Sequence, residues 1–227
     1  MELTAKKNSD EIVDLVFEAI LSKKLNPGVK LSEIALQDEF GFSRNVIREG
    51  FSKLVDSGVL IHKKNQSVRV ACPSEIQTKK IYQARKAIEN GVILILVDRH
   101  IKDNLDMSQM NDLIAKEEQL HESDQFAKLT RMSCDFHISL AELCGNEYLV
   151  ESLKPLIPLS ALAASVYASP DSHFCSYTEH QELISALNSK NPEVAIRTMS
   201  AHLDHCVQSL DFEAKAKQKT SYSHIFN

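Results

Sequence analysis

Two arginines four residues apart, Arg44 and Arg48, are the first residues whose type and spacing indicate chemistry. Residues at i and i+4 of a helix project from the same face. Guanidinium groups on such a face can make bidentate contacts with guanine in the major groove of DNA, and Asn45 can pair with adenine or contact a phosphate. Ser43 supplies a hydroxyl group at the helix start, where free backbone N–H groups also suit a phosphate. The alternative is a pair of solvated charges on an exposed helix, so the surrounding elements must decide.

Three short helices and a hairpin are predicted around this pair. Apolar residues at helical spacing, with capping residues and glycine stops, predict helices from 10 to about 22, from 33 to about 40 and from 44 to about 57. Ser9 is expected to cap the first helix. Two β-prone runs, 59–62 and 68–71, enclose a polar turn. This order is the plan of a winged helix-turn-helix, and it favours DNA contact for the two arginines.

The hairpin turn carries further candidates for DNA contact. Lys63 and Lys64 lie in the turn, where they are expected to meet the DNA backbone or the minor groove, and Arg69 follows on the second β-prone run. Residues 1–72 have 11 Lys and Arg against 10 Asp and Glu, a net charge of +1, whereas the remaining 155 residues have 15 against 21, a net charge of −6. A near-neutral module beside an acidic one is compatible with a DNA reader whose basic groups share one face.

The rest of the sequence predicts a mainly α protein in two domains. Long helical stretches are expected over 75–100, 105–121, 124–143, 147–168, 172–188 and 192–211. Pro155 and Pro158 should kink or break the fourth of these. We expect a winged helix-turn-helix domain at 1–73, an all-α bundle of six or seven helices at 74–212, and a polar tail at 213–227.

Membrane and export functions are not indicated. The longest apolar run, 92–97, is far short of a membrane span and is expected to be a buried part of the first long helix. The N-terminus has no apolar stretch after its lysines, so it does not resemble a secretion signal. Five cysteines without C-x-x-C spacing suggest reduced thiols and a cytoplasmic location.

Residues 10–71 resemble the DNA-binding domain of GntR-family regulators. The most specific part is Ser43-Arg44-x-x-x-Arg48-Glu49, followed by Leu54-Val55-x-x-Gly58-Val59-Leu60. The resemblance implies that Arg44 and Arg48 touch DNA together with the wing tip, including Gln66. The chain departs from the family pattern at the tip, where Asn65-Gln66-Ser67 stands in place of a frequent glycine. It departs again at Ile34, where some members have a DNA-contacting arginine.

Residues 78–211 resemble the FadR-type C-terminal domain of that family. The matching segments are Arg85-x-x-Ile88-Glu89, Phe136-His137, Gly145-Asn146, Glu179-His180 and Ala201-His202-Leu203. Many such domains hold a divalent metal through three histidines and an acidic residue or Asn. The resemblance implies His137, His180 and His202 as ligands of Zn or Ni, on three separate predicted helices.

The fourth ligand position is where the chain departs from that pattern. Ser133 stands where the family has its acidic ligand, four residues before His137, and Cys134 is a conceivable soft substitute. Without a metal, the histidines would be hydrogen-bonded core residues or direct contacts to an anionic effector. Arg85 and Asn146 are candidate effector contacts. For Arg85 the alternative is an ion pair with Glu89, its neighbour at i+4.

Together these features predict a DNA-binding transcriptional regulator. We expect a repressor that binds an inverted-repeat operator in double-stranded DNA as a homodimer, and whose helical domain binds a small organic acid. One alternative keeps DNA binding but makes the helical domain a dimerisation scaffold without an effector. A second is a metal-dependent hydrolase, which is disfavoured because the sequence shows no paired base, nucleophile or phosphate-cradling glycine loop.

Overall fold

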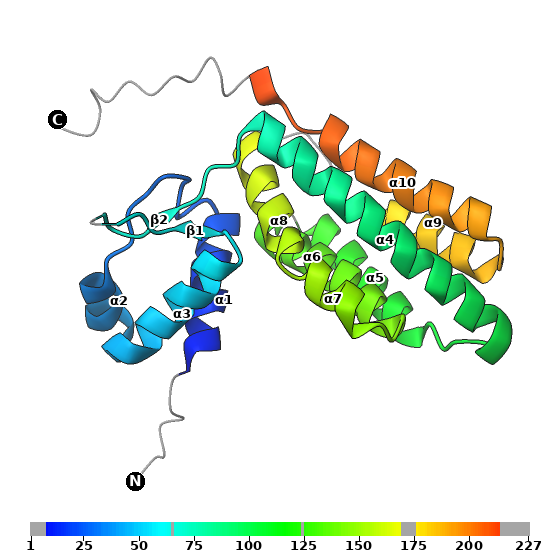
Figure 1. Ribbon diagram of the computed structural model, residues 1–227, viewed down its shortest axis with the longest axis horizontal. Helices are drawn as coiled ribbons and strands as arrows, with labels where there is room; N and C mark the ends of the chain where they lie inside the picture. Colours follow the sequence, from blue (N-terminus) through cyan, green and yellow to red (C-terminus); the bar gives the residue numbers. More distant parts are fainter. Residues whose placement is uncertain (1–7, 65, 124, 169–175, 214–227) are drawn as a thin grey trace, which may run out of the picture.

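The computed structural model describes residues 8–64, 66–123, 125–168 and 176–213. A small N-terminal head lies beside a bundle of long helices (Figure 1). The head consists of α1 (Ser9–Leu21), α2 (Glu33–Phe40), α3 (Arg44–Asp56), β1 (Leu60–Ile61) and β2 (Arg69–Val70). These bounds confirm the predicted order of three helices and a hairpin. Of the predicted C-terminal tail, residues 214–227 lie outside the described residues.

The cap of α1 differs from the prediction by one residue. Asn8, and not Ser9, is the N-cap: its side chain accepts hydrogen bonds from the backbone N–H groups of Asp10 and Glu11. The Glu11 carboxylate in turn accepts from the N–H of Asn8, which completes a capping box. Ser9 is the first helical residue and is buried, and its hydroxyl donates to Glu49 of α3 at 2.7 Å. Asn8 and Ser9 are both good N-caps, and the packing of Ser9 against α3 leaves the cap position to Asn8.

Close contact between α1 and α3 forms the centre of the head. A Cβ atom added to Gly50 of α3 would lie 2.6 Å from Cγ2 of Ile12, so only glycine allows the two helices to approach this closely. Strand β2 pairs with β1 in an antiparallel register, with Leu60 opposite Val70. On its other edge, β2 exchanges backbone hydrogen bonds with residues 28–31. The wing is thereby fixed to the rest of the head.

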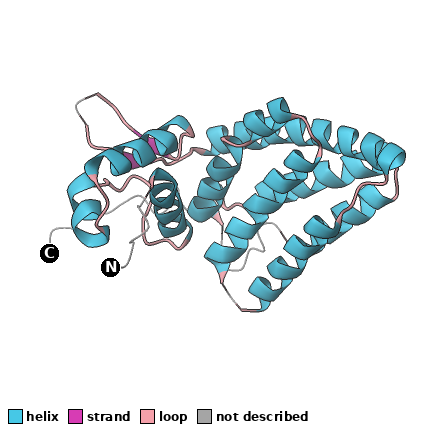
Figure 2. Cartoon of the chain, turned by 90° about the horizontal axis from the view of Figure 1, so that it is seen from below, coloured by secondary structure: helices cyan, strands magenta, loops and turns pink. Residues whose placement is uncertain are grey.

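Seven helices make up the described part of the bundle. They are α4 (Glu75–Asp103), α5 (Ser108–Glu122), α6 (Phe126–Leu143), α7 (Glu147–Leu153), α8 (Leu156–Tyr167), α9 (Tyr177–Asn188) and α10 (Pro192–Gln208). The apolar run 92–97 is helical, as predicted. The predicted break at the prolines is also confirmed, because Pro155 is the N-cap of α8 and Pro158 lies in its first turn, where backbone N–H groups have no partner within the helix. In Figure 2 the described strands are confined to the head, so the mainly α fold class is confirmed.

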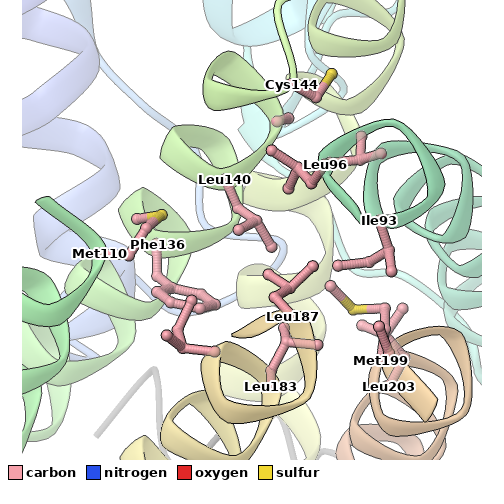
Figure 3. Packing of buried hydrophobic residues seen from close by; sticks show 14 of the residues in the cluster. Ile93, Leu96, Met110, Phe136, Leu140, Cys144, Leu183, Leu187, Met199 and Leu203 are labelled. Atoms are coloured by element: carbon pink, nitrogen blue, oxygen red, sulfur yellow. The ribbon is translucent and has the colours of Figure 1, made fainter. Parts of the chain in front are cut away.

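Apolar side chains from all seven of these helices form the bundle core. Figure 3 shows Ile93 and Leu96 of α4 facing Leu140 of α6, with Leu187 of α9 and Leu203 of α10 beside them. All of these side chains are almost completely removed from solvent. The core thus holds α4, α6, α9 and α10 together, and those are the helices that carry the polar groups discussed below.

The segment Glu147–Tyr167 is long enough and apolar enough to cross a membrane. In the structure it is two helices, α7 and α8, which are interrupted at Lys154. Residues 160–164 of α8 are buried in succession, which means that no side of this turn faces solvent. The head covers one side and the bundle the other (Figure 1), and this double burial accounts for the apolar composition.

Candidate DNA-contact helix and candidate metal centre

Helix α3 presents its N-terminal end to solvent. Ser43 is its N-cap, with its hydroxyl group accepting from the N–H of Val46, and Ser43, Arg44, Asn45 and Arg48 are all exposed. The first turn contains no acidic residue, so the positive end of the helix dipole is not neutralised within α3. This is the geometry in which a helix end can approach an anionic groove.

Two side chains of helix α2 accept hydrogen bonds from the two arginines. Arg44 donates through Nε to Gln37 at 3.2 Å, and Arg48 donates through Nε to Glu33 at 3.0 Å. In both cases only Nε is engaged among the described residues, so both Nη nitrogens of each guanidinium group remain for an outside partner. The side chain of Arg48 is 65% exposed, which weakens its ion pair with Glu33 and keeps it available for exchange with a DNA base or phosphate.

The wing places its candidates on the turn between β1 and β2. Lys63, Lys64 and Gln66 are exposed there, and the N–H of Gln66 donates to the carbonyl group of Lys63 at 2.9 Å. Arg69 lies away from the turn, with Nη1 donating to the carbonyl group of Gly28 at 3.1 Å. Arg69 therefore fastens the base of the wing, whereas the three turn residues lie exposed at its tip.

Three histidines converge in the interior of the bundle. His137 of α6, His180 of α9 and His202 of α10 are all buried, and one ring nitrogen of each lies within 4.8 Å of the others. The Nε2 atoms of His137 and His202 are 3.3 Å apart. Two nitrogen ligands at the usual zinc distance of about 2.0–2.1 Å lie about 3.3–3.4 Å apart in a tetrahedral site. The observed separation therefore suits a metal ion shared by the two rings.

A carboxylate stands behind each histidine. The three pairs join an imidazole Nδ1 to a carboxylate oxygen, at 2.5 Å for His137 and Glu89, 2.7 Å for His180 and Glu117, and 2.9 Å for His202 and Glu179. A carboxylate that accepts from Nδ1–H fixes the proton on that nitrogen, so the lone pair of Nε2 is left for a metal. The same arrangement at all three rings selects the tautomer that a metal site needs.

The charge states of one pair agree with this tautomer. Burial lowers the pKa of His137 to about 3, so its imidazole is neutral near pH 7. Burial alone would raise the pKa of Glu89, but Arg85 and His137 outweigh it and hold that pKa at about 2. A neutral ring that donates to an ionised carboxylate is the form in which histidine binds metal ions.

The residues that surround the histidines do not complete a four-ligand protein site. Ser133 is buried one turn before His137, but the group of converging donors within the described residues contains the three imidazoles alone. Cys134 packs both against the bundle core and against Phe17 and Ala161, and it does not belong to the converging group. Asp135 lies 3.5 Å from Arg131 in an ion pair. A metal ion held here would have three neutral ligands and open positions for water or a carboxylate.

A surface cleft borders one member of the histidine group. A cleft of about 420 Å³ between α9 and α10 is lined by Glu179, Arg197, His202, His205 and neighbouring residues. Glu179 binds His202 with one oxygen atom and the exposed His205 with the other, at 2.6 Å. The cleft therefore reaches the outer side of one member of the histidine group.

The structure shows the ion pair that was the alternative interpretation of Arg85, and the effector contact stays a prediction. Its Nε forms a buried ion pair with Glu89 at 2.7 Å, and its Nη1 donates to Ser160 at 2.8 Å. Burial alone would lower the pKa of Arg85, but the Glu89 carboxylate raises it, so the guanidinium group stays charged. Its Nη2 is buried without a hydrogen-bond partner among the described residues, which is costly unless a ligand supplies an acceptor.

The other candidate for effector contact is not brought to this site. Asn146 is the N-cap of α7, where its side-chain oxygen accepts from the N–H groups of Tyr148 and Leu149. It follows His137 by nine residues, or roughly 13 Å along a helix axis. The structure therefore assigns Asn146 a capping role, and the segment Gly145-Asn146 marks a helix boundary.

Sequence reasoning missed the carboxylates that support the rings. Glu117 gave a usable signal, because Met110, Ile114 and Glu117 share one buried stripe of α5, where a carboxylate needs a partner. Ser160 gave none, since a serine in an apolar helix is most simply explained as a small residue. Both depend on contacts between helices that are far apart in the sequence.

Comparison with known proteins gives matches over both domains. The family model described as "Bacterial regulatory proteins, gntR family" matches residues 8–70, and the model of the FCD domain matches residues 80–205. The Uxu operon regulator of Haemophilus influenzae is 25% identical, over 88% of this chain and 84% of its own length. The transcriptional repressor NanR of Citrobacter rodentium is also 25% identical, over 89% of this chain and 85% of its own length.

A solved structure supports the fold independently. The crystal structure of a GntR regulator from Rhodococcus sp. RHA1 superposes with a TM-score of 0.72 at 20% sequence identity, over 88% of this chain and 95% of that one. At this identity the likeness concerns the fold alone. It shows that a winged helix-turn-helix followed by a helical domain is an architecture found in experiment.

Proposed function

Because this chain belongs to the GntR family of bacterial regulatory proteins and carries an FCD domain, we propose that it is a repressor controlled by a small organic acid. The chain is a DNA-binding transcriptional regulator, and its relatives are regulators and not enzymes, so a hydrolase function is set aside. The repressor role, the effector and the metal are our proposals. One observation carries them above all: three convergent imidazoles, each with a carboxylate behind it.

The head, residues 1–73, reads the operator. Arg44 and Arg48 contact base edges from the N-terminal part of α3, while Ser43 and Asn45 contact phosphates or an adenine. Lys63, Lys64 and Gln66 contact the backbone or the minor groove from the wing. The support for these roles is the exposure of all seven residues and the free Nη nitrogens of the two arginines. A homodimer that reads an inverted repeat fits a single recognition helix per chain. These roles place the protein in the bacterial cytoplasm.

The helical domain, residues 74–212, senses the effector. His137, His180 and His202 would hold a divalent ion such as Zn or Ni, and the ion would supply open coordination positions for a carboxylate. Arg85 lies next to Glu89 of the same site, and its unpaired Nη2 suits a second oxygen of that carboxylate. Repression is supported by the description of NanR as a repressor. The remaining alternative is a helical domain that serves only as a dimerisation scaffold and binds no effector. The experiment described next distinguishes this alternative from a sensor.

Native mass spectrometry of the untagged protein tests the metal and the oligomeric state together. We expect a dimer that carries one Zn or Ni ion per chain, and a loss of this ion in His137→Ala and His202→Ala. His62→Ala removes an exposed histidine of the head and serves as the matched control, with the ion retained. A protein that stays free of metal after incubation with Zn and Ni would favour the scaffold.

A further inference from the structure

Helix α8 is the part of the bundle that lies against the head. Its two long sides face different domains: Ile157 and Ala164 belong to the buried core of the bundle, whereas Leu162 belongs to the buried core of the head. Ser160 lies between Ile157 and Ala164 at helical spacing, so it faces the bundle. One short helix is therefore shared by two hydrophobic cores.

The contacts of α8 with the head are extensive. Leu162 is completely buried in the same cluster as Ile12 of α1 and Phe51 of α3. Ala161 packs with Phe17 of α1. On the next turn back, Leu159 lies 3.3 Å from the position that a Cβ atom would take at Gly58. A rotation or translation of α8 must therefore move α1 and the end of α3, since closely packed cores leave no slack.

A buried hydrogen bond connects α8 to the residues beside the histidine group. The Ser160 hydroxyl accepts from Nη1 of Arg85 at 2.8 Å and donates to the carbonyl group of Ile157 at 2.7 Å. Arg85 is held in turn by Glu89, whose other oxygen atom binds His137. These four side chains form a continuous buried chain that runs from the histidine group to α8.

We infer that α8 transmits the state of the histidine site to the DNA-binding head through the chain His137–Glu89–Arg85–Ser160. The inference rests on the proposed function of that site. A cation held by His137 would make its Nδ1–H group a stronger donor to Glu89, and a carboxylate that is bound more strongly by His137 would bind Arg85 less strongly. An acid that accepts from Arg85 competes with Ser160 directly. Either event changes the hydrogen bond that orients α8, and α8 is embedded in the head.

The four hydrogen-bonded side chains meet the condition for coupling between two sites. A ligand can shift a conformational equilibrium only by contacts that differ between the two states. In this inference the Arg85–Ser160 hydrogen bond is the contact that would differ, because it joins a group that a ligand could engage to the helix that packs against the head. A separate ion pair joins Arg131 of α6 to Asp14 of α1 at 2.8 Å. It also connects the two domains, but it includes none of the four hydrogen-bonded side chains.

The test compares Ser160→Ala with Ser165→Ala in the full-length protein. Both serines lie on α8 and donate to a backbone carbonyl group three residues back at 2.7 Å, but Ser160 alone accepts from Arg85. Zinc is the probe. Its binding is followed by competition with a chelator, and its effect on the head by hydrogen exchange of the amides of α1. A coupling of ordinary size changes such exchange by about fivefold or more.

We expect all three proteins to bind zinc with similar affinity. Zinc should change exchange in α1 in the wild type and in Ser165→Ala, and leave it unchanged in Ser160→Ala. Ser160→Cys, which keeps the volume but accepts hydrogen bonds weakly, should behave like Ser160→Ala even if alanine leaves a cavity. Zinc binding with an unchanged α1 in the wild type, or a full response in both Ser160 variants, would overturn the inference. A wild type that binds no zinc would overturn the proposed site itself.

Discussion

Replacing Glu117 by glutamine tests whether the carboxylates behind the histidines create the metal-binding form of the rings. Glu117 and His180 are both fully buried, and they are joined at 2.7 Å through Oε2 and Nδ1. Glutamine keeps the size and one carbonyl acceptor but removes the negative charge that makes the imidazole a stronger base. If the amide group turns its NH₂ towards Nδ1, it also favours the wrong tautomer, with the proton on Nε2.

The expected loss follows from what such supporting partners contribute. Removing a carboxylate behind a ligating histidine weakens metal binding by about 10- to 100-fold. This loss corresponds to about 1.4–2.8 kcal/mol of binding free energy at 25 °C. Because Glu117 is completely shielded from solvent, water cannot compensate for the lost carboxylate, so we place the loss in the upper part of that range.

The assay is competition for zinc against a chromogenic chelator near pH 7. Glu118→Gln is the matched control, since it makes the same change at the neighbouring residue of α5, which is exposed. His180→Ala should abolish binding, Glu117→Gln should weaken it, and Glu118→Gln should leave it unchanged. Equal affinity for Glu117→Gln and Glu118→Gln, with binding lost in His180→Ala, would refute the argument from tautomers while leaving the site in place.

Three further predictions concern the head and the buried charges. Arg44→Ala combined with Arg48→Ala should lower affinity for operator DNA by about 100-fold, since a good bidentate contact contributes about 1–3 kcal/mol. Fluorescence anisotropy measures this affinity. An unchanged affinity would show that α3 is not the helix that reads the DNA. Gly50→Ala should lower the free energy of unfolding by about 1–3 kcal/mol, because its Cβ would lie 2.6 Å from a buried isoleucine of α1. Gly91→Ala, which meets nothing closer than 3.9 Å, should instead raise it by up to about 1 kcal/mol, and urea unfolding separates the two. Glu89 has a folded pKa of about 2 against an ordinary 4.5, so it stabilises the metal-free fold above pH 4.5 and loses that contribution as the pH falls towards 2. Unfolding experiments across this range should show a steeper loss of stability in the wild type than in Glu89→Gln, and parallel curves would contradict the assignment.

Local chemistry made most of the fold predictable from the sequence. A proline inside a helix interrupts its hydrogen bonding, so the break near Pro155 was predictable, and the glycines at 41 and 58 adopt positive φ angles at helix ends, as their positions indicated. The cap of α1 was wrong by one residue because Asn8 and Ser9 are both good caps. Their choice depends on Glu49, which is forty residues away from Ser9.

The candidate sites were predictable only in part. The three histidines and Arg85 could be named, because resemblance supplied their positions, and in the structure the histidines converge and Glu89 joins Arg85 to His137. The partners of His180 and the role of Ser160 could not be named, since each rests on a single long-range contact between helices. Asn146 was predicted as an effector contact because it lies in a matching segment, whereas in the structure its side chain caps α7.

The most direct test of the account is the affinity of the protein for DNA taken from upstream of its own gene, measured with and without zinc and a panel of small organic acids. The account predicts that at least one acid, in the presence of zinc, changes this affinity by more than about fivefold. His202→Ala should bind the same DNA without responding. If zinc, a chelator and every acid leave the wild-type affinity unchanged, the helical domain is not a sensor, and the central claim is contradicted.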